Sequence, residues 1–216
     1  MTENNRTRHT PNIVGAAINT SGMLLFLSGF LIFMGIITGE MFYTLPFNTR
    51  GNYISELAAA LPPGTVTPPV SAAIFNLTMI VTGIMVIVSG FLLVSVFKKL
   101  LATIPLIMFG AGMTGVGVCP GNVVPWHGIF AIVIFLTGGI GAITSFKIVK
   151  GPLRYVLICF GIIALILLFF AKKFIPLLGV GGAERWLFYP EVFWIMGLGG
   201  YLLGHTNGYK DLKDIF

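Results

Sequence analysis

The chain has 216 residues, of which 56% are hydrophobic and only 9% are charged, and its mean hydropathy is +0.95. A soluble domain of this length cannot bury so much apolar surface, so the composition excludes a water-soluble protein and indicates an integral membrane protein. The formal net charge of +6 is explained by membrane topology and by attraction to anionic lipid headgroups, and we do not expect nucleic-acid binding.

Six apolar runs are long enough to cross a hydrocarbon core about 30 Å thick, which needs roughly 20 residues of helix. They lie near residues 13–38, 71–97, 100–118, 126–146, 153–171 and 188–206. Runs such as YVLICFGIIALILLFF are apolar on every face, whereas strands of a β-barrel alternate between apolar and polar residues. The sequence therefore predicts an all-α polytopic membrane protein, a six-transmembrane-helix bundle that forms one domain over residues 1–216.

The distribution of Lys and Arg predicts the orientation, because short cytoplasmic loops carry an excess of these residues. With the N-terminus inside, the inner segments hold nine of them and the outer segments hold four, which are Arg50, Lys172, Lys173 and Arg185. We therefore expect a multi-pass protein of the cell membrane with both termini in the cytoplasm.

Polar residues at the membrane boundaries collect on the outer side in this topology. They are Arg50, Asn52, Ser55 and Glu56 after the first span, His127 at the start of the fourth, and Glu184, Arg185, Tyr189 and Glu191 before or at the start of the sixth. No ionisable residue is then expected deep in a span, where a charge costs roughly 2.5–3.5 kcal/mol on insertion scales. This expectation weighs against a proton pump, a voltage sensor or an ion-coupled carrier.

The segment NYISELAAAL, residues 52–61, predicts a short amphipathic helix in the first outer loop. Its apolar residues Ile54, Leu57 and Leu61 have helical spacing, and Pro62 and Pro63 would end the helix. Such an interfacial segment tolerates polar side chains only where they find partners inside the bundle. We therefore expect a lid over a cluster of the outer polar side chains.

Two interpretations of this cluster remain open. It can anchor the lid without any chemistry, as satisfied polar networks do. Alternatively it binds a lipid headgroup or a membrane-protein partner, with Arg50 and Arg185 toward phosphate and with Asn52, Ser55 and Glu184 as further contacts. Membrane lipids are the expected partners in the second interpretation.

An enzyme is the alternative function, in which Glu56 and His127 act as base and acid in hydrolysis or transfer of an acyl group of a membrane lipid. If the lipids are ether-linked, that reaction loses its substrate. A small-molecule carrier is a further alternative, disfavoured by the absence of an obvious inverted repeat.

Two other patterns do not indicate a cofactor or metal site. GAGMTG, residues 110–115, has the spacing of a dinucleotide-binding loop but lies inside a span, where small residues serve helix packing. His9 and His205 are expected inside and His127 outside, so the histidines cannot share a metal ion. We predict neither a cofactor nor a metal.

Three segments, YISELAAALPPG, the glycine-rich third span leading to His127, and AERWLFY, resemble in order the signatures of a superfamily of six-span membrane proteins. It contains the DRAM autophagy modulators, the Sfk-type plasma-membrane proteins and the Golgi (Frag-type) proteins that remodel GPI-anchor lipids. The chain is most similar to a prokaryotic, often archaeal, branch with N-Y-I-S-[DE]-L. The resemblance implies six helices and a lipid-facing role, and it identifies no reaction.

Overall fold

The computed structural model describes residues 6–44, 46–58 and 69–205, with side chains from residue 13 onward except that of Pro69. Its helices are α1 (Arg6–Met41), α2 (Pro69–Phe97), α3 (Leu100–Val118), α4 (Trp126–Thr144) and α5 (Leu153–His205), and two short 3-10 turns are η1 (Ile54–Leu57) and η2 (Ser145–Lys147). The described ranges contain no strand, so the all-α prediction is confirmed.

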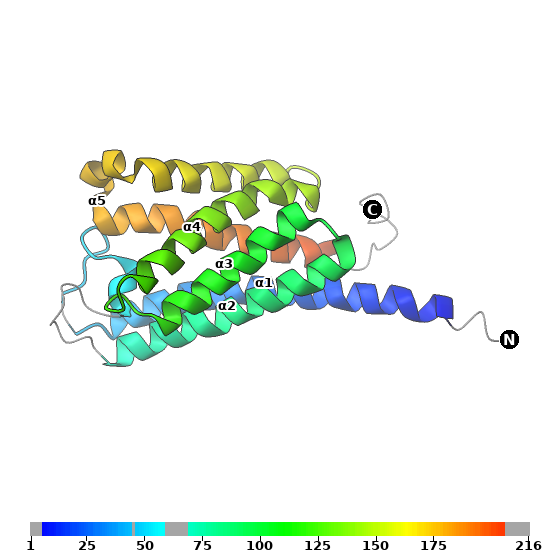
Figure 1. The fold of residues 1–216 in the computed structure, drawn as a ribbon, viewed down its shortest axis with the longest axis horizontal. Coiled ribbons are helices and arrows are strands. Elements are labelled where there is room, and N and C mark those ends of the chain that lie inside the picture. Colours follow the sequence, from blue (N-terminus) through cyan, green and yellow to red (C-terminus); the bar gives the residue numbers. More distant parts are fainter. Residues whose placement is uncertain (1–5, 45, 59–68, 206–216) are drawn as a thin grey trace.

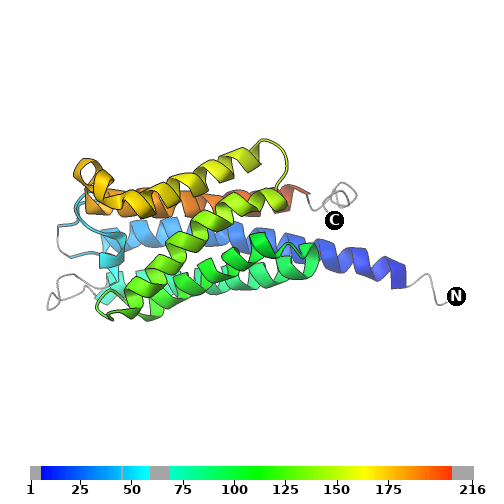
Figure 2. The ribbon, with the colours of Figure 1, turned by 45° about the horizontal axis from the view of Figure 1, so that its top comes forward.

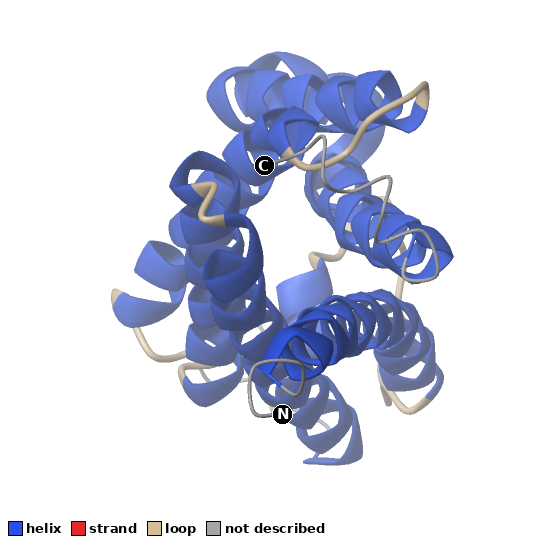
Figure 3. Ribbon diagram, turned by 90° about the vertical axis from the view of Figure 1, so that its right-hand side faces the viewer, coloured by secondary structure: helices blue, strands red, loops and turns tan. Residues whose placement is uncertain are grey.

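The helices form one bundle in which neighbours in sequence are neighbours in space (Figure 1). α1 packs on α2, α2 on α3, α3 on α4 and α4 on α5, and α5 returns to pack on α1. Figure 3, which looks along the bundle, shows how this last contact closes the ring of helices.

α5 folds back on itself (Figures 1 and 2). Its helical geometry is broken at Phe170 and at Gly179, where φ is 75°, a conformation that favours glycine. We call residues 153–169 the first arm and residues 180–205 the second arm. The arms run side by side in opposite directions. Phe160 of the first arm and Phe193 of the second have ring centroids 6.1 Å apart, and the Lys150 N–H, just before the first arm, donates to the Tyr201 hydroxyl near the end of the second.

Five helices in the described residues are long and apolar enough to cross a membrane. Large apolar side chains such as Phe26, Phe30 and Ile37 of α1 are exposed on the outside of the bundle, as expected where lipid replaces water. The protein is therefore a multi-pass membrane protein. Its predicted runs fall on α1 to α4, on the first arm of α5 and on the second arm.

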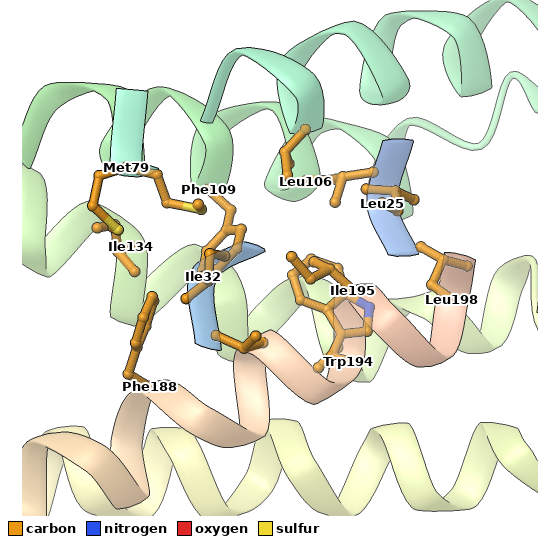
Figure 4. Close-up of a cluster of buried hydrophobic side chains, with 14 of the residues drawn as sticks. Leu25, Ile32, Met79, Leu106, Phe109, Ile134, Phe188, Trp194, Ile195 and Leu198 are labelled. Carbon is orange, nitrogen blue, oxygen red and sulfur yellow. The ribbon is translucent and has the colours of Figure 1, made fainter. Parts of the chain in front are cut away.

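The core of the bundle is built around Trp194 of the second arm (Figure 4). Its indole ring meets the edge of Phe109 with centroids 5.6 Å apart, and its N–H donates to the Ser145 hydroxyl over 2.6 Å. Gly141 of α4 leaves room for this ring, because a Cβ there would lie 2.4 Å from an indole carbon. A polar ring nitrogen is thus satisfied within an otherwise apolar core.

Glycines set the distance between α2 and α3. A Cβ on Gly110 would lie 2.7 Å from the Gly83 carbonyl oxygen, closer than a Cβ can approach backbone. GAGMTG is accordingly a helix-packing sequence in the middle of α3, as small residues commonly are at helix contacts in membranes.

Replacing Gly110 by Ala should lower the free energy of unfolding by about 1–3 kcal/mol, because the added methyl group forces α2 and α3 apart. Unfolding of the purified protein by sodium dodecyl sulfate measures the change. Gly204→Ala is the matched control, since a Cβ at that helical position meets nothing within 4 Å. Equal effects of the two substitutions would contradict the packing role of Gly110.

Candidate functional site

Arg185, at the start of the second arm, connects three separate parts of the chain. Its guanidinium pairs with the Glu40 carboxylate at the end of α1 over 2.8 Å. It also donates to the carbonyl oxygens of Thr49 and Asn52, over 2.8 and 2.9 Å, and to that of Gly181 in its own arm. Arg185 is only 8% exposed, so these bonds are made largely out of water and fix the first outer loop against the bundle.

Two carboxylates hold the turn that follows. Glu184 accepts the backbone N–H of Ile54 and a hydrogen bond from the Ser55 side chain. Glu56 accepts the side-chain amide of Asn52 over 2.7 Å and the N–H of Tyr53 over 2.9 Å. The turn is therefore bonded both within itself and to the second arm.

Burial and, next, the nearby Glu56 carboxylate raise the pKa of Tyr43 above its ordinary value. Glu56 thus supplies negative charge to the buried side of this loop, where Tyr43 packs edge to face on Phe47.

Glycines of the segment GVGG let the loop approach the second arm. A Cβ on Gly179 would lie 2.2 Å from the Arg50 carbonyl oxygen, and one on Gly181 would lie 2.0 Å from that of Asn52. The Gly181 N–H donates to the Arg50 carbonyl oxygen over 3.0 Å. These close backbone contacts require the absence of side chains at both positions.

The structure brings together five of the predicted site residues, namely Asn52, Ser55, Glu56, Glu184 and Arg185. The sequence analysis missed Glu40, Gly179 and Gly181. Glu40 could have been noticed as the lone acid at the end of the first apolar run, but nothing in the sequence shows that it faces Arg185. Nothing in the sequence shows that Gly179 and Gly181 lie against the backbone of a distant loop.

The predicted interfacial helix takes a different form in the described residues. η1 has only four residues, and Ile54, Glu56 and Leu57 in it are buried rather than lying on the surface. A 3-10 turn fits here because the Glu56 carboxylate caps the Tyr53 N–H at its start. Residues 59–63 of the predicted helix and its prolines lie outside the described residues.

A groove of about 750 Å³ lies between the two arms of α5, beside the first outer loop. The polar side chains at its loop end are Thr49, Arg50 and Arg185. The rest of the lining is mainly apolar or aromatic: Phe160, Ile163, Leu177, Leu178, Gly182, Trp186, Tyr189, Pro190 and Phe193. Arg50 is exposed at this end, and within the described residues its guanidinium donates one long hydrogen bond, 3.4 Å, to the Pro176 carbonyl oxygen. The groove therefore combines apolar walls with a guanidinium that can take an anion.

His127 does not line the groove but lies at a second, smaller cavity beside the cluster. Its Nδ1 is 2.9 Å from the Cys119 carbonyl oxygen, and its ring lines a cavity of about 30 Å³ together with Ser55 and Glu184. Such a volume holds about one water molecule. Glu56 is not among the residues that line it, so the structure does not place Glu56 and His127 around space for an ester.

One expectation from the sequence is wrong. Glu191, which was placed at the outer boundary, is fully buried in the second arm, and its carboxyl group lies against Gly138 in the middle of α4. An ionisable residue therefore does lie deep in the bundle. Among the described residues, no three His, Cys, Asp or Glu side chains are arranged to hold a metal ion.

Replacing Arg185 by Met should lower the free energy of unfolding by roughly 3 kcal/mol, the lower end of the range for breaking a buried pair, because Glu40 is partly exposed. Lys172→Met, an exposed position near the turn of α5, should change it by less than about 0.5 kcal/mol. Detergent unfolding of both variants tests this, and a loss below about 1 kcal/mol for Arg185→Met would show that the cluster is not a structural tie.

No curated protein and no solved structure matches the chain. A family model described as "Protein of unknown function (DUF998)" matches residues 26–201, a range that contains every residue of the site described above. The chain therefore belongs to the DUF998 family of proteins of unknown function.

Proposed function

We propose that this protein binds the anionic headgroup of a membrane lipid at the non-cytoplasmic end of a bundle that crosses the membrane six times. The observation that carries the proposal is the groove of about 750 Å³ with Arg50 and Arg185 at one end and mainly apolar walls beyond them. Its volume is within the usual range of ligand pockets, about 300–1,000 Å³. The similarity of the first outer loop to lipid-remodelling membrane proteins supports the same role.

The path of α5 supports six crossings. The start of α1 and the end of α5 lie at the same end of the bundle (Figures 1 and 2), which favours an even number of crossings. Four crossings by α1 to α4 and one by each arm of α5 satisfy this. The excess of Lys and Arg at the end that holds both of these helix termini supports a cytoplasmic location for it.

The charge of Arg50 favours a lipid phosphate as the ligand. A planar guanidinium forms paired hydrogen bonds with phosphate oxygens. Arg50 has no carboxylate partner among the described residues, whereas Arg185 is already paired with Glu40. We therefore assign Arg50 to the headgroup and Arg185 to the support of the loop that carries Arg50. The acyl chain would lie along Phe160, Leu178 and Phe193 between the arms.

Binding is favoured over catalysis because the candidate acid and base do not share a usable cavity. Glu56 is bonded to Asn52 and Tyr53, and the space beside His127 has room for about one water. A protein partner remains the other occupant of the groove, and the lipid experiment below distinguishes the two.

The topology predicts which introduced cysteines react with a membrane-impermeant maleimide on intact cells. In a chain with Cys119 and Cys159 replaced by Ser, a cysteine at Lys172 should be labelled, whereas cysteines at Lys150 and Gly204 should be labelled only after the cells are opened. If α5 crossed the membrane once, Lys150 and Gly204 would lie on opposite sides. Labelling of only one of these two positions on intact cells would therefore exclude six crossings.

The lipid proposal predicts that Arg50→Gln weakens retention of an anionic phospholipid about tenfold, the effect of losing about 1.4 kcal/mol of charge-assisted hydrogen bonding. Titration of the purified protein with phosphatidylglycerol, followed by native mass spectrometry, measures the affinity. Lys172→Gln is the charge-matched control and should leave it unchanged, because Lys172 does not line the groove. Replacing Leu178 by Trp should also weaken binding by filling the groove.

Unchanged lipid affinity in both groove variants would refute lipid binding here and leave a protein partner or a purely structural role. Loss of affinity in Lys172→Gln equal to that in Arg50→Gln would instead indicate general surface charge.

A further inference from the structure

Glu191 is the most unusual residue outside the site. Its side chain is 0% exposed, and neither carboxyl oxygen has a hydrogen-bond partner by distance and angle in the described residues. The backbone N–H of Gly139 is a nearby donor, but it does not meet the distance and angle of a hydrogen bond to this carboxyl group. A buried carboxyl group without partners is rare and costly, so it calls for a specific explanation.

The position of Glu191 is in the interior of the bundle. Phe188 and Trp194, three residues before and after it, point into the core beside Ile134 and Phe109 (Figure 4). A Cβ on Gly138 would lie 2.4 Å from the Glu191 carboxyl carbon, so the carboxyl group packs directly on the α4 backbone. Gly138 is twelve residues into α4, which corresponds to about 18 Å along the helix.

No Lys, Arg or His side chain in the described residues forms an ion pair with Glu191. α2 and α3 contain no ionisable residue, α4 contains only His127 near its start, and η2 contains Lys147 at the opposite end. On α1 the described ionisable side chain is that of Glu40, which is paired with Arg185. Arg185 itself is six residues before Glu191, about 9 Å along the second arm, and its neighbours Glu184 and Tyr189 cannot supply positive charge.

We infer that Glu191 is a proton-binding site in the core of the bundle: its carboxyl group holds a proton while α4 and the second arm of α5 are packed together, and releases it only when they separate. An ionised carboxylate in this packing would lack both a counter-ion and hydrogen-bond donors, whereas the protonated acid is uncharged and can donate to a helix carbonyl oxygen. The proton is the ligand of the site, and separation of the two helices is the event that it would control.

This site is distinct from the lipid groove. Glu191 does not line the groove, although Pro190 and Phe193 do, because it points toward α4 rather than between the arms of α5. The proton site can therefore be correct whether or not the groove binds lipid. The sequence argument against a proton-linked function was that no ionisable residue lies deep in a span. The buried Glu191 removes that argument.

The test compares the pH dependence of unfolding in the wild-type protein and Glu191→Gln. Unfolding exposes Glu191 to solvent, where an ordinary glutamate has a pKa of about 4.3 and loses its proton at neutral pH. The unfolded chain then binds one proton fewer than the folded chain, so raising the pH favours unfolding. For each pH unit, the folding equilibrium constant of the wild type should fall up to tenfold more than that of Glu191→Gln. Lys172→Gln, at an exposed position near the turn of α5, should retain the wild-type slope.

Infrared spectroscopy gives a second readout, and its main observation, a band in protein that retains Glu191, does not depend on folding of Glu191→Gln. With ¹³C-labelled glutamate in Glu184→Gln, a carbonyl band of protonated glutamic acid should persist at pH 8 and should be absent when Glu191 is also replaced. Parallel pH profiles of the wild type and Glu191→Gln, or no protonated-acid band at pH 8, would overturn the proposal.

Discussion

The arrangement of the end of the bundle that carries residues 46–58 depends on the buried guanidinium of Arg185. Its ion pair with Glu40 and its bonds to loop carbonyl oxygens join α1, the first outer loop and α5 at one point. The guanidinium is buried, so loss of these partners would leave its charge unpaired where water reaches it poorly, which is the costly case for polar groups. The position of Arg50 at the groove, and so the proposed headgroup contact, follows from this arrangement.

The reversal of α5 is the second constraint. Gly179, with its positive φ, lets the chain turn and also lets the Arg50 backbone approach, so one residue serves both the reversal and the loop contact. The two arms then leave a groove whose loop end is cationic and whose length is apolar. A phospholipid has the same division, with a charged headgroup and apolar chains, whereas a soluble metabolite does not.

Composition and the long apolar runs were sufficient to predict a helical membrane protein, because hydrocarbon thickness sets both the length and the apolar character of spans. The predicted association of Asn52, Ser55, Glu56, Glu184 and Arg185 also appears in the structure, since polar side chains at one membrane boundary have few other partners. His127 bonds to the Cys119 carbonyl oxygen instead, a local contact that the sequence does not signal. Glu191 was misplaced because its distance from the boundary depends on where α5 turns, which hydropathy does not show.

Hydrogen exchange of the protein in lipid nanodiscs tests the central claim most directly, because it reports on the loop without any substitution. Ile54 and Gly181 donate their amides to Glu184 and to the Arg50 carbonyl oxygen, and both bonds join the loop to the second arm. These amides should exchange far more slowly than those of an unstructured peptide, since release requires the loop to leave Arg185 and the second arm. Exchange at the rate of an unstructured peptide would show that the first outer loop is not held against α5, and the account of the site would then be wrong.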